Sequence, residues 1–200
     1  MNDPIASILR FGDPRLKEVC EPVSRQSIET ELAAEAEQLL RTVHAFRARY
    51  GWGRAIAAPQ VGIMKRMIAM VLDGREHVLI NPTMTWASEA RAEVWDDCMS
   101  LPEIAVRVQR HYSVTVRFRR LDGREEAFEK ADFSLSELLQ HELDHLDGIL
   151  MTDRMRPTSS IVAHENRELA DMAKVRSKDP NGLEMFKAGA SRPKVERAML

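Results

Sequence analysis

Gln140-His141-Glu142-Leu143-Asp144-His145-Leu146-Asp147-Gly148 is the stretch around which this chain is expected to fold. On an α-helix His141 and His145 share a face, so their two imidazole nitrogens can bind one tetrahedral cation. Glu142 lies beside that cation rather than on it, where its carboxylate can take a proton from a bound water. The alternative is a solvated helix face with two unused histidines. The spacing favours a metallohydrolase.

Composition points to a globular protein rather than a secreted, membrane or nucleic-acid-binding one. The 200 residues are 44% hydrophobic and 30% charged, with a net charge of −2, and no basic stripe alternates with aromatic residues. Cys20 and Cys98 are the only cysteines, too few for a disulfide framework. No signal peptide and no apolar run of membrane-spanning length are visible. We therefore expect a cytoplasmic protein without a membrane or nucleic-acid partner.

Hydrophobic periodicity predicts helices and strands in a mixed order. Apolar residues recur at helical spacing from about Ser27 to Tyr50, which predicts an N-terminal helix. Ser134 and Glu137 form the pattern of a capping box, which would begin the helix that carries the two histidines. The predicted strands cover residues 67–72, 77–80, 103–109, 113–119 and 125–133, with Asp73-Gly74 as a hairpin turn and Asn81-Pro82 as a strand end.

The C-terminal part of the sequence is less regular. Residues 161–175 predict a weaker, more polar helix, and from Ser177 onward prolines and glycines interrupt any periodicity. The sequence shows neither a repeat nor a second domain. We therefore expect one metallohydrolase domain over residues 1–176 and a loosely ordered tail over residues 177–200.

Two histidines leave a catalytic cation one protein ligand short. One protease pattern would place a third histidine six residues after His145, but that residue is Met151. A second protease class takes a glutamate from a later helix, where Glu165 and Glu168 are available, although their charge-rich surroundings are typical of a solvated face. The third candidate is Cys98, whose thiolate would be a strong soft ligand. The residues alone leave these last two options open.

Three segments, taken together, resemble the peptide deformylase family. The first joins Gly53 to Ala57-Ala58-Pro59-Gln60, the second contains Cys98, Ser100 and Pro102, and the third is the whole of Gln140–Gly148. They occur in the family's order, and the likeness extends over about residues 5–155. The resemblance implies an α+β fold, with antiparallel β-sheets packed around a central metal-binding helix, an N-terminal helix and a C-terminal helical tail.

The resemblance also implies a ligand set. Cys98, His141 and His145 would bind one divalent metal ion, which would be Fe(II) in the native protein, with Zn(II), Ni(II) or Co(II) able to replace it. This choice of third ligand comes from the family pattern and not from the spacing of the residues.

The reaction that the family pattern implies is hydrolysis of an N-terminal formyl amide. Water on the metal would attack the formyl carbon of an N-formylmethionyl peptide, and Glu142 would move the proton to the leaving amine. The Gln60 side-chain amide and the Met99 backbone N–H would hold the developing oxyanion. The implied substrates are nascent peptides, which would bring a transient association with the ribosome. The products would be formate and a peptide with a free N-terminal methionine.

Several residues depart from the family pattern at positions where substrate would bind. Ala55 replaces a second glycine after Gly53, Ile56 replaces a leucine, and Asp97 replaces the glycine before the cysteine. Glu137 lies four residues before the first motif histidine, where the family places an apolar residue that lines the methionine pocket. We expect substrate contacts from these five positions, Gly53, Ala55, Ile56, Asp97 and Glu137.

These departures leave other activities open. The first is a divergent deformylase-like amidase with a different small acylated substrate or with reduced activity. The second is a zinc protease with a glutamate as third ligand. A purely structural metal site is the least favoured, because such sites close the fourth position with a protein ligand and none is visible near the motifs.

Overall fold

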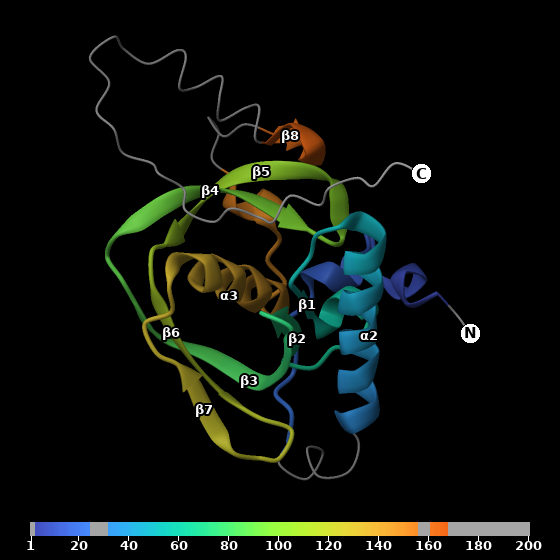
Figure 1. Cartoon of the computed structure of the whole chain (residues 1–200), viewed down its shortest axis with the longest axis vertical. Helices are drawn as coiled ribbons and strands as arrows, with labels where there is room; N and C mark the ends of the chain where they lie inside the picture. The colour runs from blue at the N-terminus through green and yellow to red at the C-terminus, as the bar shows by residue number, and fades with distance from the viewer. Residues whose placement is uncertain (1–2, 25–31, 156–160, 168–200) are drawn as a thin grey trace, which may run out of the picture. The chain divides into compact units, whose positions relative to one another are not determined.

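The computed structural model describes residues 3–24, 32–155 and 161–167, all of which lie in the unit Met1–Arg167 (Figure 1). Neighbouring strands pair antiparallel throughout, which confirms the predicted α+β class. The helices are α2 (Leu32–Tyr50) and α3 (Phe133–Leu146), with 3-10 helices η1 (Pro4–Ser7), η2 (Pro14–Lys17), η3 (Ala58–Val61), η4 (Met151–Arg154) and η5 (His164–Asn166). The strands are β1 (Ala55–Ala57), β2 (Met67–Leu72), β3 (Arg75–Ala87), β4 (Arg91–Cys98), β5 (Leu101–His111), β6 (Val114–Arg119), β7 (Glu125–Phe128) and β8 (Ile161–Ala163).

The larger sheet has the strand order β1-β2-β3-β6-β7 and is buried on both faces at β1 and β2. Side chains of a strand alternate between faces, so Ile68 and Met70 pack with residues of α3, whereas Met67, Ala69 and Val71 pack with residues of α2. This is why the β2 sequence is an unbroken apolar run. Asp73 and Gly74 then form the predicted hairpin turn, with φ of 48° and 76°.

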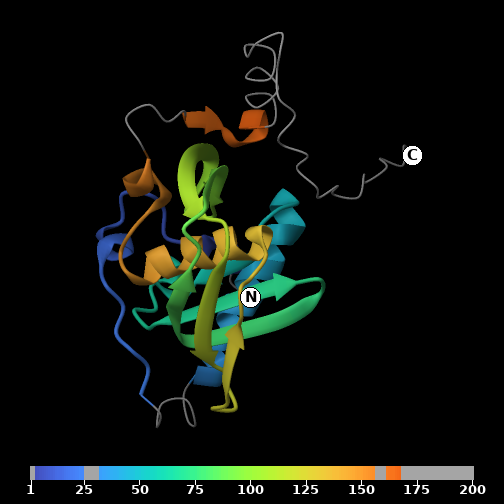
Figure 2. The ribbon, with the colours of Figure 1, turned by 90° about the vertical axis from the view of Figure 1, so that its left-hand side faces the viewer.

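Helix α3 is the centre of the structure. Every residue from Leu138 to Leu146 is buried, although the segment contains two histidines and two acids. One face packs on the larger sheet through leucines, and the opposite side meets β5 of the smaller sheet (Figure 2). A helix enclosed on all sides cannot leave its polar side chains to water, so each of them needs a partner or a ligand.

The smaller sheet, of order β4-β5-β8, brings the second cysteine to α3. Strand β4 ends at Cys98, a turn covers Met99 and Ser100, and β5 begins at Leu101. Cys98 therefore lies at the end of a strand, next to the turn that joins β4 to β5. The sequence also missed β4 itself, because only Asp96 and Cys98 among its eight residues are buried and the strand lacks an apolar alternation.

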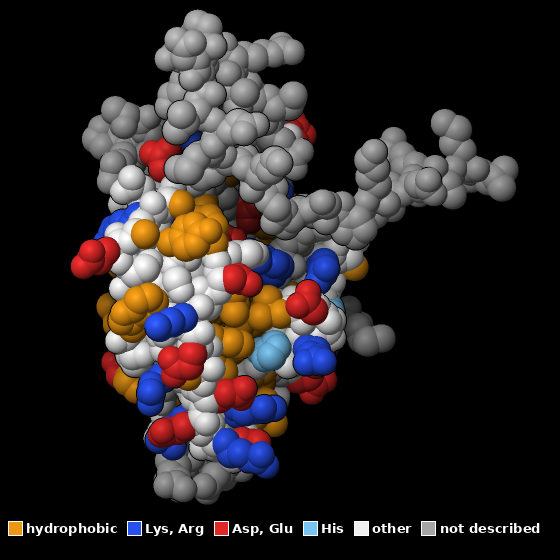
Figure 3. Space-filling model, turned by 60° about the vertical axis from the view of Figure 1, so that its left-hand side comes forward, with side chains coloured by type: hydrophobic (Ala, Val, Ile, Leu, Met, Phe, Trp, Pro, Cys, Tyr) orange, Lys and Arg blue, Asp and Glu red, His pale blue; other side chains and the backbone are white. Residues whose placement is uncertain are grey.

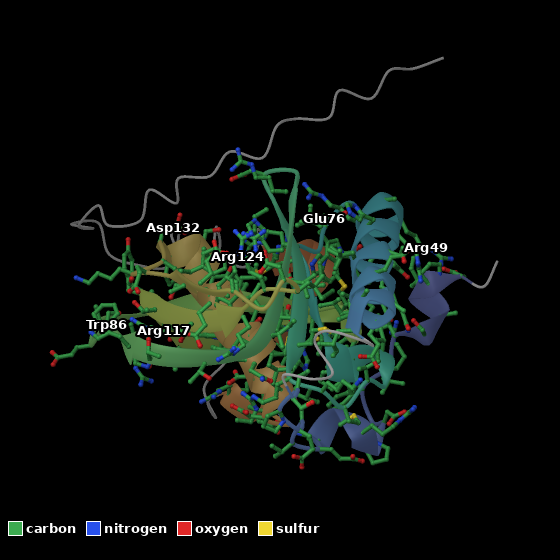
Figure 4. The ribbon with its side chains drawn as sticks, turned by 90° about the horizontal axis from the view of Figure 1, so that it is seen from below. Arg49, Glu76, Trp86, Arg117, Arg124 and Asp132 are labelled. Carbon is green, nitrogen blue, oxygen red and sulfur yellow. The ribbon has the colours of Figure 1, made fainter. Side chains whose placement is uncertain are left out.

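Four predicted boundaries were wrong, the first being the end of the strand predicted over 125–133, since β7 ends at Phe128. Asn81-Pro82 does not end a strand, because β3 continues to Ala87 through register shifts, with Asn81 at φ 50°. Within the predicted helix 161–175, the described part forms β8 and η5, since residues 161–163 pair with Ile104–Val106 of β5. Helix α3 begins one residue after Asp132, which is visible at the start of the helix in Figure 4.

The capping box predicted from Ser134 and Glu137 is therefore absent. Asp132 is the N-cap, and its carboxylate accepts a hydrogen bond of 2.9 Å from Leu135 N. Asp132 and Ser134 are both good N-cap residues, and Asp132 begins the helix earlier. Glu137 is consequently left without the local role that the sequence gave it.

The surface carries charges of both signs together with exposed hydrophobic side chains. On the face drawn in Figure 3, Lys and Arg side chains alternate with Asp and Glu. Among the described residues, no helix is long and apolar enough to cross a membrane. The start of the helix predicted from Ser27 and the tail over 177–200 lie outside the described residues.

Candidate metal centre

Three buried donors converge between α3 and the end of β4. Cys98 Sγ lies 3.2 Å from His145 Nε2, and this nitrogen lies 3.2 Å from His141 Nε2. All three donor atoms lie within 4.8 Å of one another, and each of the three residues is buried. Helical spacing of four places the two imidazoles together, and the β4–β5 turn supplies the thiol from 43 residues earlier than the first histidine.

This donor set fits a divalent transition metal. Tetrahedral coordination by thiolate and imidazole, with bonds of about 2.0–2.3 Å, needs donors separated by roughly 3.3–3.6 Å, close to the observed contacts. Cys98 is the third donor, whereas Glu165 is exposed on η5 and is not part of the group. Glu168 lies outside the described residues. The glutamate-liganded alternative has no support in the described part of the chain.

Asp96 orients the first histidine from behind. Its Oδ1 lies 2.7 Å from His141 Nδ1, which leaves Nε2 of the same ring directed at the other donors. Burial opposes protonation of His141, but the adjacent Asp96 carboxylate outweighs it and raises the pKa of His141 well above its ordinary value. Burial and the neighbouring His141 lower the pKa of His145 well below its ordinary value.

Asp96 belongs to a buried chain of charges that continues into α3. Arg110 donates to Asp96 Oδ2 at 2.6 Å and to Asp144 Oδ2 at 2.5 Å, and all three side chains are at most 8% exposed. Arg154 of η4 adds two further bonds to Asp144, at 3.0 and 2.5 Å. Although burial would raise the pKa of Asp96, the charges of His141 and Arg110 hold it well below its ordinary value.

The sequence reading missed the roles of Asp96, Arg110 and Asp144. The sequence did indicate that the Arg110 side chain points inward. Arg110 occupies the next position in the alternating pattern of Val106 and Val108, which face the core. An arginine at an inward position requires acidic partners, and β4 and α3 provide them. The partners themselves cannot be read from the spacing of the residues.

Glu142 combines burial with an unpaired oxygen. Its side chain is 3% exposed, and Oε2 has no hydrogen-bond partner. Burial raises the pKa of Glu142 to about 7, against the attraction of His141. A carboxyl that titrates near neutral pH and directs a free oxygen into a buried site has the properties of a general base.

Gln60 is fixed on the opposite side of the donor group. Its Oε1 accepts a bond of 2.8 Å from Ala57 N, which aims Nε2 at Ser100 Oγ (3.2 Å) and Cys98 Sγ (3.5 Å). The short helix η3 creates this arrangement, with Pro59 in its first turn and Gly62 ending it at φ 81°. The structure thus brings the predicted Gln60 to the predicted metal ligands.

Gly53 is required by a close approach to the site. Its φ is +98°, and a Cβ built there would lie 2.6 Å from Met99 Cε and 3.0 Å from Phe46 Cδ1. The positive φ favours glycine, and a side chain here would also require the end of the Met99 side chain to move. Gly53 thereby permits Met99, which directly follows the cysteine donor, to pack against the β1 segment.

The other four predicted substrate residues differ in their surroundings. Ala55 and Ile56 are buried in the cores on opposite faces of the larger sheet. Asp97 Oδ2 lies 2.6 Å from Arg167 Nη1 and 3.2 Å from His164 Nε2. The ring of His164 also stacks on Trp52.

Glu137 forms an ion pair with Arg54, the residue that precedes β1. Arg54 Nη2 donates to Glu137 Oε1 at 2.5 Å, and Arg54 Nη1 donates to Ser134 O and Oγ at 3.2 and 2.9 Å. The Arg54 and Glu137 side chains are 38% and 22% exposed. Burial, despite Arg54, raises the pKa of Glu137 above its ordinary value.

Comparison with known proteins identifies the family. The polypeptide deformylase family model matches residues 5–160. A peptide deformylase of Bartonella tribocorum is 34% identical over 75% of this chain and 84% of its own, and a "peptide deformylase-like" protein of Brucella melitensis is 36% identical over 74% and 87%.

Solved structures give the same result. The Thermotoga maritima peptide deformylase has a TM-score of 0.68 at 30% identity, covering 75% of this chain and 97% of the other. A Synechococcus elongatus peptide deformylase, solved in complex with actinonin, has a TM-score of 0.69 at 30% identity, covering 87% of each chain. The chain therefore belongs to the peptide deformylase family.

Proposed function

We propose that this protein hydrolyses the formyl amide at the N-terminus of formylated peptides, with N-formylmethionyl peptides as the first substrates to test. The observation that carries the proposal is the convergence of Cys98, His141 and His145 beside the unpaired carboxylate oxygen of Glu142. Family membership supports a hydrolase of this type.

Cys98, His141 and His145 would hold a single divalent cation. When bound, the cation supplies Lewis acidity, which acidifies water and polarises a carbonyl. The mixed thiolate and imidazole donors suit Fe(II), which we propose as the native metal, and also Zn(II), Ni(II) and Co(II). Asp96 keeps one of the imidazoles in the orientation that this binding requires.

Glu142 is proposed to move the proton. Its carboxylate would take a proton from the attacking water and deliver it to the departing amine nitrogen, so that the formyl C–N bond breaks as the amine becomes neutral. Burial raises the pKa of Glu142 in the metal-free site, which favours the protonated carboxyl that would deliver the proton to the amine.

Gln60 and Met99 are proposed to stabilise the oxyanion. Gln60 Nε2 already lies within 3.5 Å of Cys98 Sγ, so a carbonyl oxygen brought to the donor group would meet an amide N–H. The Met99 backbone N–H, next along the chain from the cysteine, would be the second donor. The rigid attachment of Gln60 to Ala57 N means that no reorganisation is needed during the reaction.

An extended peptide has an edge on which to bind. β1 is the end strand of the larger sheet and lies against α3, so the backbone of Ala55 and Ile56 could pair with substrate while their side chains stay in the core. Gly53 and Asp97 would flank this edge. If the substrates are nascent chains, a transient contact with the ribosome in the cytoplasm is a further prediction.

Formate release tests the proposal. The Fe(II)-loaded protein, prepared without oxygen to protect the thiolate, should release formate from formyl-Met-Ala-Ser and from related formyl tripeptides. Glu142→Gln, with equal metal content, should lose activity by about 10²–10⁴-fold. Absence of formate from every formyl peptide at full metal occupancy would overturn the proposed function.

A further inference from the structure

The Arg54–Glu137 ion pair lies next to the metal ligands along α3. Glu137 is one helical turn from His141 on the same face of α3. Arg54 immediately precedes β1, which packs against α3 and leads to Gln60. The pair is also close enough for Arg54 to act on the charge of Glu142, and for Asp96 and Asp97 to act on that of Glu137.

Exposure distinguishes this pair from the residues that it borders. Arg54 and Glu137 are 38% and 22% exposed, whereas His141 is 6% exposed and Cys98 is 2% exposed. The pair is thus the more solvent-accessible neighbour of the buried donor group. A substrate that reaches the donors from this side would place its neighbouring side chain against these two charges.

Neither residue is needed to begin the helix. Asp132 supplies the N-cap, so Glu137 has no capping function. Arg54 is instead anchored by Ser134, with bonds to both its backbone and hydroxyl oxygens, and its second nitrogen holds Glu137 in place. Arg54, Ser134 and Glu137 therefore form a fixed, partly solvated group beside the metal ligands. We call this group the platform.

An apolar side chain would be a poor occupant of that platform. Packing a thioether or an alkyl group on the pair would remove water from both charges without replacing any hydrogen bond. A primary amide can replace those hydrogen bonds, because it donates to a carboxylate and accepts from a guanidinium.

We propose that Arg54 and Glu137 determine specificity, selecting formylated substrates whose first side chain is polar and donates hydrogen bonds over those with methionine. This inference rests on the proposed deformylase function and refines its substrate class.

The test compares methionine with glutamine, which has nearly the same length and shape. Rates of formate release from formyl-Gln-Ala-Ser and formyl-Met-Ala-Ser are measured with wild type and with Arg54→Leu/Glu137→Leu. We expect wild type to have a kcat/KM about 10-fold higher for the glutamine peptide, and the double variant to reverse that preference. Lys65→Met/Glu35→Leu removes a pair of similar exposure, 31% and 28%, and should keep the wild-type preference.

A binding measurement separates this inference from the proposed function. Zinc-loaded Glu142→Gln, with and without the Arg54→Leu/Glu137→Leu changes, is titrated calorimetrically with the same two peptides. The glutamine peptide should bind more tightly only when the ion pair is present. If the ratio of the affinity for the glutamine peptide to that for the methionine peptide is the same with and without the pair, the inference is overturned. The proposed deformylation would not be affected by that result. If the ion pair changes the ratio of the two peptide affinities as expected but the wild-type protein releases no formate, the proposed reaction is overturned. The inference about the ion pair then stands.

Discussion

The metal centre is bordered by two sets of charges that differ in burial. Behind His141, Asp96 and Arg110 are each 3% exposed and belong to a continuous chain of bonds. In front, Arg54 and Glu137 are 38% and 22% exposed and form a separate pair. Both sets are ion pairs at short distance, and both contact the same helix.

Burial decides what each set can do. The rear charges cannot be solvated, so every one must keep its partner, and the result is a rigid support for the donor atoms. The front charges keep part of their hydration and can exchange water for a ligand. Ion pairs of the same kind therefore support the metal ligands on one side and, in the proposal above, would contact the substrate on the other.

Removing Arg110 should give the largest effect on stability. Arg110→Met would leave the Asp96 and Asp144 carboxylates buried without their shared cation, and we expect a loss of about 3–5 kcal/mol in the free energy of unfolding. Urea denaturation of the metal-free protein measures it. Arg117→Met, which removes an exposed arginine (67%), is the control and should change stability by less than about 0.5 kcal/mol. Equal effects of the two substitutions would break the distinction between buried and exposed charges.

Glu142 should make the metal-free protein less stable as pH rises. The pKa of Glu142 is about 7 in the folded state against an ordinary 4.5, so the folded state binds the proton more tightly. The contribution of Glu142 to the free energy of unfolding is fully present below pH 4.5 and decreases between pH 4.5 and 7. It is lost above that range. Glu142→Gln should therefore exceed wild type at pH 8 by up to about 3 kcal/mol and match it at pH 4. Parallel pH profiles of the two proteins would contradict this.

Asp96→Asn should weaken metal binding more than it weakens the fold. The neutral amide orients His141 less firmly, and we expect about 10–100-fold lower affinity for Zn(II), measured by competition with a chelator. Glu93→Gln, on the same strand but with a side chain 47% exposed, should leave the affinity unchanged. An Asp96→Asn protein with wild-type affinity would show that the rear charges do not position the donors.

The front pair should contribute least to stability. Arg54→Leu/Glu137→Leu removes a partly exposed ion pair, and we expect the unfolding free energy to change by less than about 1 kcal/mol. Thermal unfolding of the metal-loaded protein checks this. A loss as large as that of Arg110→Met would mean that the pair supports the fold rather than the choice of substrate.

The sequence predicted the part of the site that lies within one helix. The spacing of His141, Glu142 and His145 is a local property of the chain, and the structure places the two histidines in one donor group with Glu142 buried beside them in α3. Cys98 could not be chosen over the later glutamates by residue chemistry, because the fold alone brings a strand end to α3. The family pattern supplied that choice, and the structure agrees with it.

Predictions failed where tertiary contacts compete with local patterns. Ser134 resembled an N-cap, but Asp132 occupies that position and the helix begins earlier. Glu137 has its partner, Arg54, 83 residues earlier in the chain, a distance that no periodicity reveals. Residues 161–163 form a strand because β5 offers an edge, although their own sequence favoured a helix.

The most direct test of the reaction is hydrolysis of a formyl tripeptide in isotopically labelled water by the Fe(II)-loaded protein. Mass spectrometry of both products identifies the bond that is cleaved. We predict formate that carries one labelled oxygen, an otherwise intact tripeptide with a free N-terminus, and loss of both products in Glu142→Gln. Cleavage of an internal peptide bond with the formyl group retained, or no cleavage at full metal occupancy, would contradict the account.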